Sequence, residues 1–225
     1  MTTGPDLDAV AACLALISAA EPRCGDTVVV AVDGPSGAGK TTLTRALRRH
    51  LGRSPVLHLD ALYPGWDGLS LTPAILHDGV LAPLARGERA AYQRFDWEAG
   101  AFAEEHEVRA APLLLVEGCG AGAWPGFAYV SVLIWVDAPT EVRYERAIAR
   151  DGETYRPNWE RWAASERALF RADRTRERSD LVVDARQTWT PSGDPRMDEP
   201  APPRPEWAEW PHGSGNGPPG APGNG

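Results

Sequence analysis

A segment around residue 40 combines glycines, one lysine and hydroxyl residues at a spacing suited to phosphate chemistry. It reads Gly34-Pro-Ser-Gly-Ala-Gly39-Lys40-Thr41 and follows a run of β-branched residues. Glycines in this pattern let successive backbone N–H groups converge on phosphate oxygens at the N-terminus of the next helix. The lysine brings a mobile positive charge to the β and γ phosphates, and the threonine hydroxyl is a magnesium ligand. The segment therefore predicts a P-loop that binds a nucleoside triphosphate with Mg²⁺.

The single lysine of the chain favours ATP as the nucleotide. Lys40 is the only lysine among 23 basic residues, so the Asn-Lys-x-Asp motif that specifies guanine is absent. A glycine-rich turn without a ligand explains neither this lysine nor the threonine beside it. The residues expected to contact the nucleotide are Gly34, Ser36, Gly37, Ala38, Gly39, Lys40, Thr41 and Thr42.

Apolar runs and helical patterns alternate along the chain and would position this loop. The runs lie at 27–33, 55–60, 112–117, 129–137 and 180–184, and helical patterns lie at 40–51, 72–85, 140–150 and 158–173. Runs without polar alternation are typical of strands that are covered on both faces. We therefore expect an α/β P-loop NTPase fold, with a doubly wound, parallel, five-stranded sheet and helices on both faces.

The composition separates one domain from a tail and excludes several partners. We expect a domain at 1–189 that opens with a helix at about 6–20, and a disordered tail at 190–225, which is rich in proline and glycine. The formal net charge of −8 argues against duplex nucleic acid as a partner. The apolar stretch 9–20 is too short for a membrane span. Three cysteines without metal-type or disulfide spacing indicate a reducing compartment, so we expect a cytoplasmic protein.

Further motifs follow the other predicted strands. Asp60-Ala-Leu-Tyr63 comes after the second run, Glu117-Gly118 after the third, and a helix with Arg143, Arg146 and Arg150-Asp151 after the fourth. In this order and spacing, residues 27–184 resemble the uridine kinase group of P-loop kinases, which includes phosphoribulokinase and pantothenate kinase. The resemblance implies that Asp60 accepts the proton of the substrate hydroxyl and that a carboxylate at Glu117 helps Thr41 to hold magnesium. A turn-capping role for Asp60 and a plain turn at Glu117 remain open.

The three arginines of this helix share one face. None has an acidic partner three or four residues away within the helix, so an anion nearby would relieve their mutual repulsion. The resemblance implies a lid at about 150–158 and places Arg146 and Arg150 beside Lys40 around the transferred phosphoryl group. A solvated helix face is the alternative interpretation.

The resemblance also implies a substrate side, where the motifs are altered. Trp66-Asp67-Gly68 occupies the place of the family's Phe-Asp-His-Pro segment, which holds the sugar hydroxyls, but lacks the histidine and proline. Tyr92-Gln-Arg-Phe95-Asp96-Trp97 occupies the place of the family's later Tyr-Asp-Phe segment in altered form. We expect Tyr63, Asp67, Tyr92 and Asp96 to bind a substrate that need not be uridine. The aromatic rings either stack on a planar ligand or belong to the core.

These inferences predict an ATP-dependent kinase that phosphorylates a hydroxyl of a small, nucleoside-like molecule. A nucleoside monophosphate kinase is the nearest alternative, and its second phosphate site would use Arg86, Arg89 and Arg94. A non-catalytic, ATP-binding regulatory module is a third hypothesis, although such a module needs no base at Asp60. The sequence leaves the oligomeric state open, including a homo-oligomer.

Overall fold

Five strands form a parallel sheet in the computed structural model, which describes residues 7–52 and 54–186. They are β1 (Val28–Asp33), β2 (Val56–His58), β5 (Leu113–Glu117), β6 (Val132–Asp137) and β7 (Leu181–Asp184). Their order is β2-β5-β1-β6-β7, so β1 lies at the centre between β5 and β6. The loop that follows β1 therefore emerges at the middle of the carboxyl edge, where ligands of such sheets bind.

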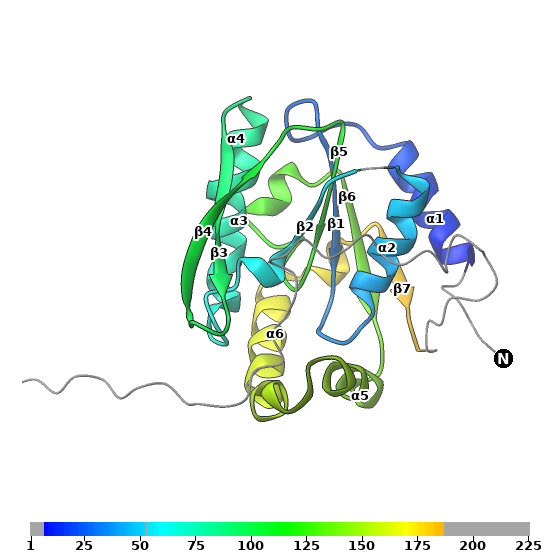
Figure 1. The fold of residues 1–225 in the computed structure, drawn as a ribbon. Coiled ribbons are helices and arrows are strands. Elements are labelled where there is room, and N and C mark those ends of the chain that lie inside the picture. Colours follow the sequence, from blue (N-terminus) through cyan, green and yellow to red (C-terminus); the bar gives the residue numbers. More distant parts are fainter. Residues whose placement is uncertain (1–6, 53, 187–225) are drawn as a thin grey trace, which may run out of the picture.

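Helices cover both faces of this sheet (Figure 1). Helices α1 (Leu7–Ser18) and α2 (Lys40–His50) share one apolar core with Val30 and Val32 of β1. The opposite face packs Val29 and Ala31 against α3 (Thr72–Leu76), α4 (Ala82–Ala85), α5 (Thr140–Asp151) and α6 (Trp159–Asp173). Because successive strand residues point to opposite faces, the uninterrupted apolar run of β1 contributes to both cores.

The predicted fold class and the expected strands and helices are confirmed, with differences at some boundaries. The strand expected at 55–60 ends at His58, and Leu59–Ala61 forms a 3-10 turn that carries Asp60 out of the sheet. The helix expected at 72–85 contains a π-helical turn at His77–Leu81 between α3 and α4. The tail predicted at 190–225 lies outside the described residues, and within those residues no helix is long and apolar enough to cross a membrane.

An antiparallel hairpin of β3 (Ala90–Asp96) and β4 (Ala101–Val108) was not expected from the sequence. Ala90 and Tyr92 of β3 join the apolar core of the α3 and α4 face, whereas most of β4 is exposed. A register shift between Gln93 and Phe95 disturbs the alternation of polar and apolar residues that marks a half-buried strand. In Figure 1 the hairpin lies beside α3 and α4, away from α1 and α2.

Candidate active site

The predicted P-loop connects β1 to α2, and its glycines adopt backbone conformations that other residues avoid. Gly34, Gly37 and Gly39 have φ values of 135°, 76° and 108°. A Cβ atom on Gly34 would lie 2.1 Å from the Val136 carbonyl oxygen, and one on Gly37 would lie 2.2 Å from the Arg143 carbonyl oxygen. The loop can therefore pack this closely on β6 and α5 only with glycine at both positions. It delivers its N–H groups to the N-terminus of α2, as a phosphate site requires.

Lys40 begins α2 and folds back over the start of the loop. Its ammonium nitrogen donates to the carbonyl oxygens of Gly34 at 2.8 Å and Pro35 at 3.1 Å, and only 8% of the residue is exposed. Burial by itself lowers the pKa of Lys40, but the surrounding groups, which include Glu117 and Glu166, raise it above the ordinary value. The ammonium is therefore charged at neutral pH and lies beside the predicted phosphate cradle.

Asp33 fastens the start of this loop to the chain that follows β5. Its buried carboxylate accepts the N–H groups of Gly34 at 2.6 Å, Gly120 at 2.9 Å and Gly122 at 2.9 Å. Burial raises the pKa of Asp33 to about 6, although these three hydrogen bonds act in the opposite direction. The carboxylate thus joins two loops at the carboxyl edge of the sheet.

The two predicted magnesium ligands lie together. The Thr41 hydroxyl is 3.2 Å from Oε1 of Glu117, and Nδ1 of His58 is 2.6 Å from the same oxygen. Burial raises the pKa of Glu117, but the hydrogen bond and charge of His58, the charge of Lys40 and the hydrogen bond from Thr41 together outweigh it, so the pKa lies below its ordinary value. A hydroxyl and an ionised carboxylate are the hard oxygen donors that Mg²⁺ prefers, so the two residues fit this ion.

His58 is a member of this site that the sequence interpretation missed. It ends β2, two residues before Asp60, and that position was the only signal that could have revealed it. Within the described ranges 7–52 and 54–186, no three His, Cys, Asp or Glu side chains form a metal-holding group. An ion bound by Thr41 and Glu117 would complete its coordination with water and phosphate oxygens, as Mg²⁺ commonly does.

Asp60 lies in the 3-10 turn after β2 and is an exposed residue, although neighbouring protein groups surround its carboxylate. Its backbone carbonyl accepts the indole N–H of Trp97 at 2.9 Å, which ties the turn to the hairpin. The pKa of Asp60 is raised, first by desolvation and further by Glu117, while Arg150 and Lys40 oppose the rise. The structure therefore brings the predicted base within electrostatic reach of Lys40, Glu117 and Arg150.

The arginine stripe of α5 faces the P-loop, and two of its three arginines have carboxylate partners. Arg143 donates to the Ser36 carbonyl oxygen at 3.2 Å, and Arg146 donates to those of Gly37 at 3.5 Å and Ala38 at 3.4 Å. Arg143 also lies 3.7 Å from Glu166 of α6, and Arg150 pairs with the adjacent Asp151 at 2.6 Å. The expectation of an uncompensated stripe was wrong for Arg143 and Arg150, because their carboxylates lie outside the helical spacings considered. A catalytic role for Arg146 and Arg150 stays a prediction.

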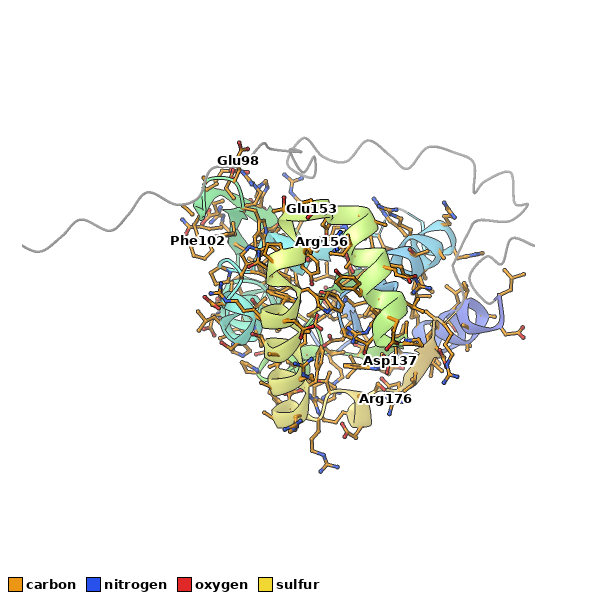
Figure 2. All side chains as sticks on the ribbon, turned by 90° about the horizontal axis from the view of Figure 1, so that it is seen from below. Glu98, Phe102, Asp137, Glu153, Arg156 and Arg176 are labelled. Carbon is orange, nitrogen blue, oxygen red and sulfur yellow. The ribbon has the colours of Figure 1, made fainter. Side chains whose placement is uncertain are left out.

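The segment expected to be a lid joins α5 to α6. It contains 3-10 turns at Gly152–Thr154 and Arg156–Asn158. Arg156 pairs with Glu153 at 3.0 Å and donates to the Tyr144 hydroxyl at 2.8 Å. Figure 2 shows Glu153 and Arg156 together at this connection between the two helices.

The four predicted substrate residues have structural contacts of their own. Tyr63 is 2% exposed and donates its hydroxyl to the Cys119 carbonyl oxygen at 3.1 Å, and the Tyr92 ring stacks on His106. Asp67 pairs with Arg161 of α6. Asp96 accepts the N–H groups of residues 98 and 99 in the hairpin turn. The pKa of Asp96 is lowered, first by the hydrogen bond from the Ala99 N–H and then by those from Arg94 and the Glu98 N–H. Substrate binding by these residues stays a prediction.

Comparisons with known proteins agree with this architecture. The sequence profile of the AAA domain family matches residues 30–177, well over half of the chain. The chain belongs to the AAA domain family. In this AAA domain protein the matched region includes the P-loop, Asp60, Glu117 and the whole of α5. No match was found among curated proteins.

Two solved structures are similar to this chain at low sequence identity. One, described as a possible uridine kinase from Bacillus stearothermophilus, is 17% identical with a TM-score of 0.57, and the match covers 79% of this chain and 98% of that one. Another, described as a candidate fructose transport system kinase from Silicibacter sp. TM1040, is 23% identical with a TM-score of 0.48 and covers 77% and 97%. The first match confirms the P-loop kinase-like fold that the resemblance to the uridine kinase group implied. At these identities the likeness extends to the fold alone.

Proposed function

We propose that this AAA domain protein is an ATP-dependent kinase that transfers the γ-phosphoryl group to a hydroxyl of a small, nucleoside-like molecule. One observation supports catalysis above all. Asp60 is an exposed residue, and its carboxylate interacts electrostatically with Lys40 of the P-loop, Glu117 and Arg150. A site that only holds a nucleotide has no need of an aspartate in an exposed turn among phosphate-binding and metal-binding groups.

In the proposed reaction the residues mainly position the reactants and neutralise charge. The P-loop N–H groups and Lys40 hold the phosphates. Thr41 and Glu117 would hold Mg²⁺, which neutralises phosphate charge when it is bound. Asp60 accepts the hydroxyl proton as the acceptor oxygen bonds to the γ-phosphorus and the bond to ADP breaks. Its raised pKa makes it a stronger base than an ordinary aspartate.

A nucleoside-like acceptor is favoured by the surroundings of Asp60. Trp97, which is hydrogen-bonded to the Asp60 backbone, packs edge-to-face on Trp66 with ring centroids 5.0 Å apart. Both indoles are partly exposed. They offer apolar surface for a planar ring at the side where the acceptor hydroxyl must approach.

The nucleoside monophosphate kinase alternative has less support. Its second phosphate site would use three arginines that already pair with carboxylates on or next to the hairpin. Arg86 pairs with Glu88, Arg89 with Glu105, and Arg94 with Glu104. A phosphate at this position would have to displace these carboxylates and would meet their negative charge.

An acceptor panel tests the proposed function. ADP formation is measured with ATP and Mg²⁺ against nucleosides, nucleoside monophosphates and hydroxyl-bearing vitamins, with Asp60→Asn as the matched control. Stimulation of ADP formation by a nucleoside, lost in the control, would support the proposal. Stimulation by a monophosphate alone would favour the second phosphate site. ATP binding without stimulation by any acceptor would indicate a regulatory module and overturn the kinase.

A further inference from the structure

Ser36, in the first half of the P-loop, is bonded through all three of its polar groups by side chains of α5 and α6. Its N–H donates to Oε1 of Glu166 at 2.7 Å. Its hydroxyl accepts the indole N–H of Trp162 at 2.9 Å, and its carbonyl oxygen accepts Nη1 of Arg143 at 3.2 Å. This N–H was expected to meet the nucleotide, but a protein carboxylate holds it instead. The two helices that flank the predicted lid thus hold the start of the phosphate cradle.

Glu166 is the centre of this arrangement. It is 2% exposed, and Oε1 also accepts the Trp162 indole N–H at 2.8 Å and the Cys119 thiol at 3.2 Å. Arg143 lies 3.7 Å from its other oxygen. A carboxylate buried this deeply is tolerated only with several hydrogen bonds and an opposite charge. These contacts fix Glu166 in one place, and Glu166 in turn fixes the Ser36 amide.

The same backbone segment determines where Lys40 lies. Its ammonium binds the carbonyl oxygens of Gly34 and Pro35, the two residues directly before Ser36. A rotation of the peptide group between Pro35 and Ser36 would break the Ser36 to Glu166 hydrogen bond and turn the Pro35 carbonyl away from the ammonium. The position of the phosphate-binding lysine and the bond to Glu166 therefore depend on each other.

We propose that Glu166 is a positioning residue for nucleotide binding. Acting through Ser36, it keeps the first half of the P-loop and Lys40 in a phosphate-binding arrangement and couples that arrangement to α6 and the lid segment. Glu166 itself contacts no phosphate in this role. The proposal rests on the proposed function only in that the P-loop binds ATP.

The positioning role of Glu166 depends on where its acceptor oxygen is held. Substitutions of Glu166 separate the position of this oxygen from the negative charge of the side chain. Glu166→Gln keeps an acceptor oxygen at the same reach without the charge. Glu166→Asp keeps the charge but withdraws the oxygen by one methylene. Glu166→Ala removes both. Glu160, an exposed residue on the same helix, provides matched controls through Glu160→Gln, Glu160→Asp and Glu160→Ala.

Two measurements on the full-length protein decide the question. Titration calorimetry with ATP and Mg²⁺ gives the dissociation constant, and amide hydrogen exchange without nucleotide reports on a peptide that covers residues 34–41. We expect the Ala and Asp variants to weaken ATP binding by about tenfold or more, the cost of one lost charge-assisted hydrogen bond. In both variants the 34–41 peptide should exchange faster, while the Gln variant and the Glu160 series stay close to wild type.

Other results would overturn the proposal. If Glu166→Asp has the ATP affinity and the 34–41 hydrogen exchange of the wild type, Glu166 has no positioning role. Tighter ATP binding by Glu166→Gln would show that the carboxylate competes with phosphate. If Glu166→Ala does not fold, the comparison of Gln with Asp still decides. A wild-type protein that binds no ATP would overturn the proposed function, whereas the exchange measurement would still test whether Glu166 holds the loop.

Discussion

Gly37 lies where any side chain would collide with α5, so the substitution Gly37→Ala tests how the P-loop is packed. Gly37 has a φ of 76°, and a residue with a Cβ atom is destabilised by about 1–2 kcal/mol in this conformation. The new Cβ would lie 2.2 Å from the Arg143 carbonyl oxygen, a distance that must grow by about 1 Å to reach a close carbon–oxygen contact. Overpacking of this kind adds about 1–3 kcal/mol. The expected loss of unfolding free energy is therefore about 2–5 kcal/mol.

The displacement should also impair the nucleotide site. Arg143 and Arg146 of α5 hold the carbonyl oxygens of Ser36, Gly37 and Ala38, and a shift of α5 by about 1 Å would stretch these hydrogen bonds beyond their normal length. We expect ATP affinity to fall by about tenfold or more, the equivalent of roughly 1.4 kcal/mol.

Urea unfolding and calorimetric ATP titration measure both effects. Gly87→Ala is the matched control, because Gly87, just after α4, has a φ of 68° and its added Cβ would have no atom within 4 Å apart from its neighbours in the chain. It should show only the conformational cost, with ATP affinity unchanged. Equal stability losses in the two variants, or wild-type ATP affinity in Gly37→Ala, would refute the packing argument.

Three further predictions concern charged groups of the site. Lys40→Arg should lower the rate of phosphoryl transfer by about 10²-fold or more. A longer, forked guanidinium does not fit where the ammonium binds two carbonyl oxygens. Near-normal turnover would contradict this prediction. Asp60→Asn should lower turnover by about 10²–10⁴-fold with ATP affinity nearly intact, as measured by steady-state kinetics and calorimetry; equal losses in both would point to a binding role. Asp33 should make stability depend on pH. Its folded pKa of about 6 lies above the ordinary value of 3.8, so the folded state holds the proton more tightly. The contribution of Asp33 to the free energy of unfolding is fully present below pH 4 and falls by about 3 kcal/mol as the pH rises through 6. Urea unfolding between pH 4 and 7 should show this fall relative to Asp33→Asn, and parallel profiles of the two proteins would contradict it.

The P-loop, the sheet and most helices could be predicted because each depends on local sequence. The glycines, Lys40 and Thr41 form a contiguous pattern, and the strands are short apolar runs covered on both faces. The hairpin was missed because its register shift and exposed second strand obscure the alternation of polar and apolar residues. Outside the hairpin, β3 packs on the π-helical turn between α3 and α4 and on the 3-10 turn at Leu59–Ala61, and local patterns do not reveal these contacts.

By itself, the sequence determined the phosphate-binding loop, the parallel α/β sheet and the carboxylates after its strands. Only the tertiary structure decided the partners of these groups. His58 meets Glu117 because β2 and β5 pair in register, and Glu166 meets Ser36 across 130 residues because α6 packs against the P-loop. Such pairs depend on how elements pack, whereas propensity and periodicity describe only neighbours along the chain. The same limit explains why the arginine stripe looked uncompensated until its carboxylates were located.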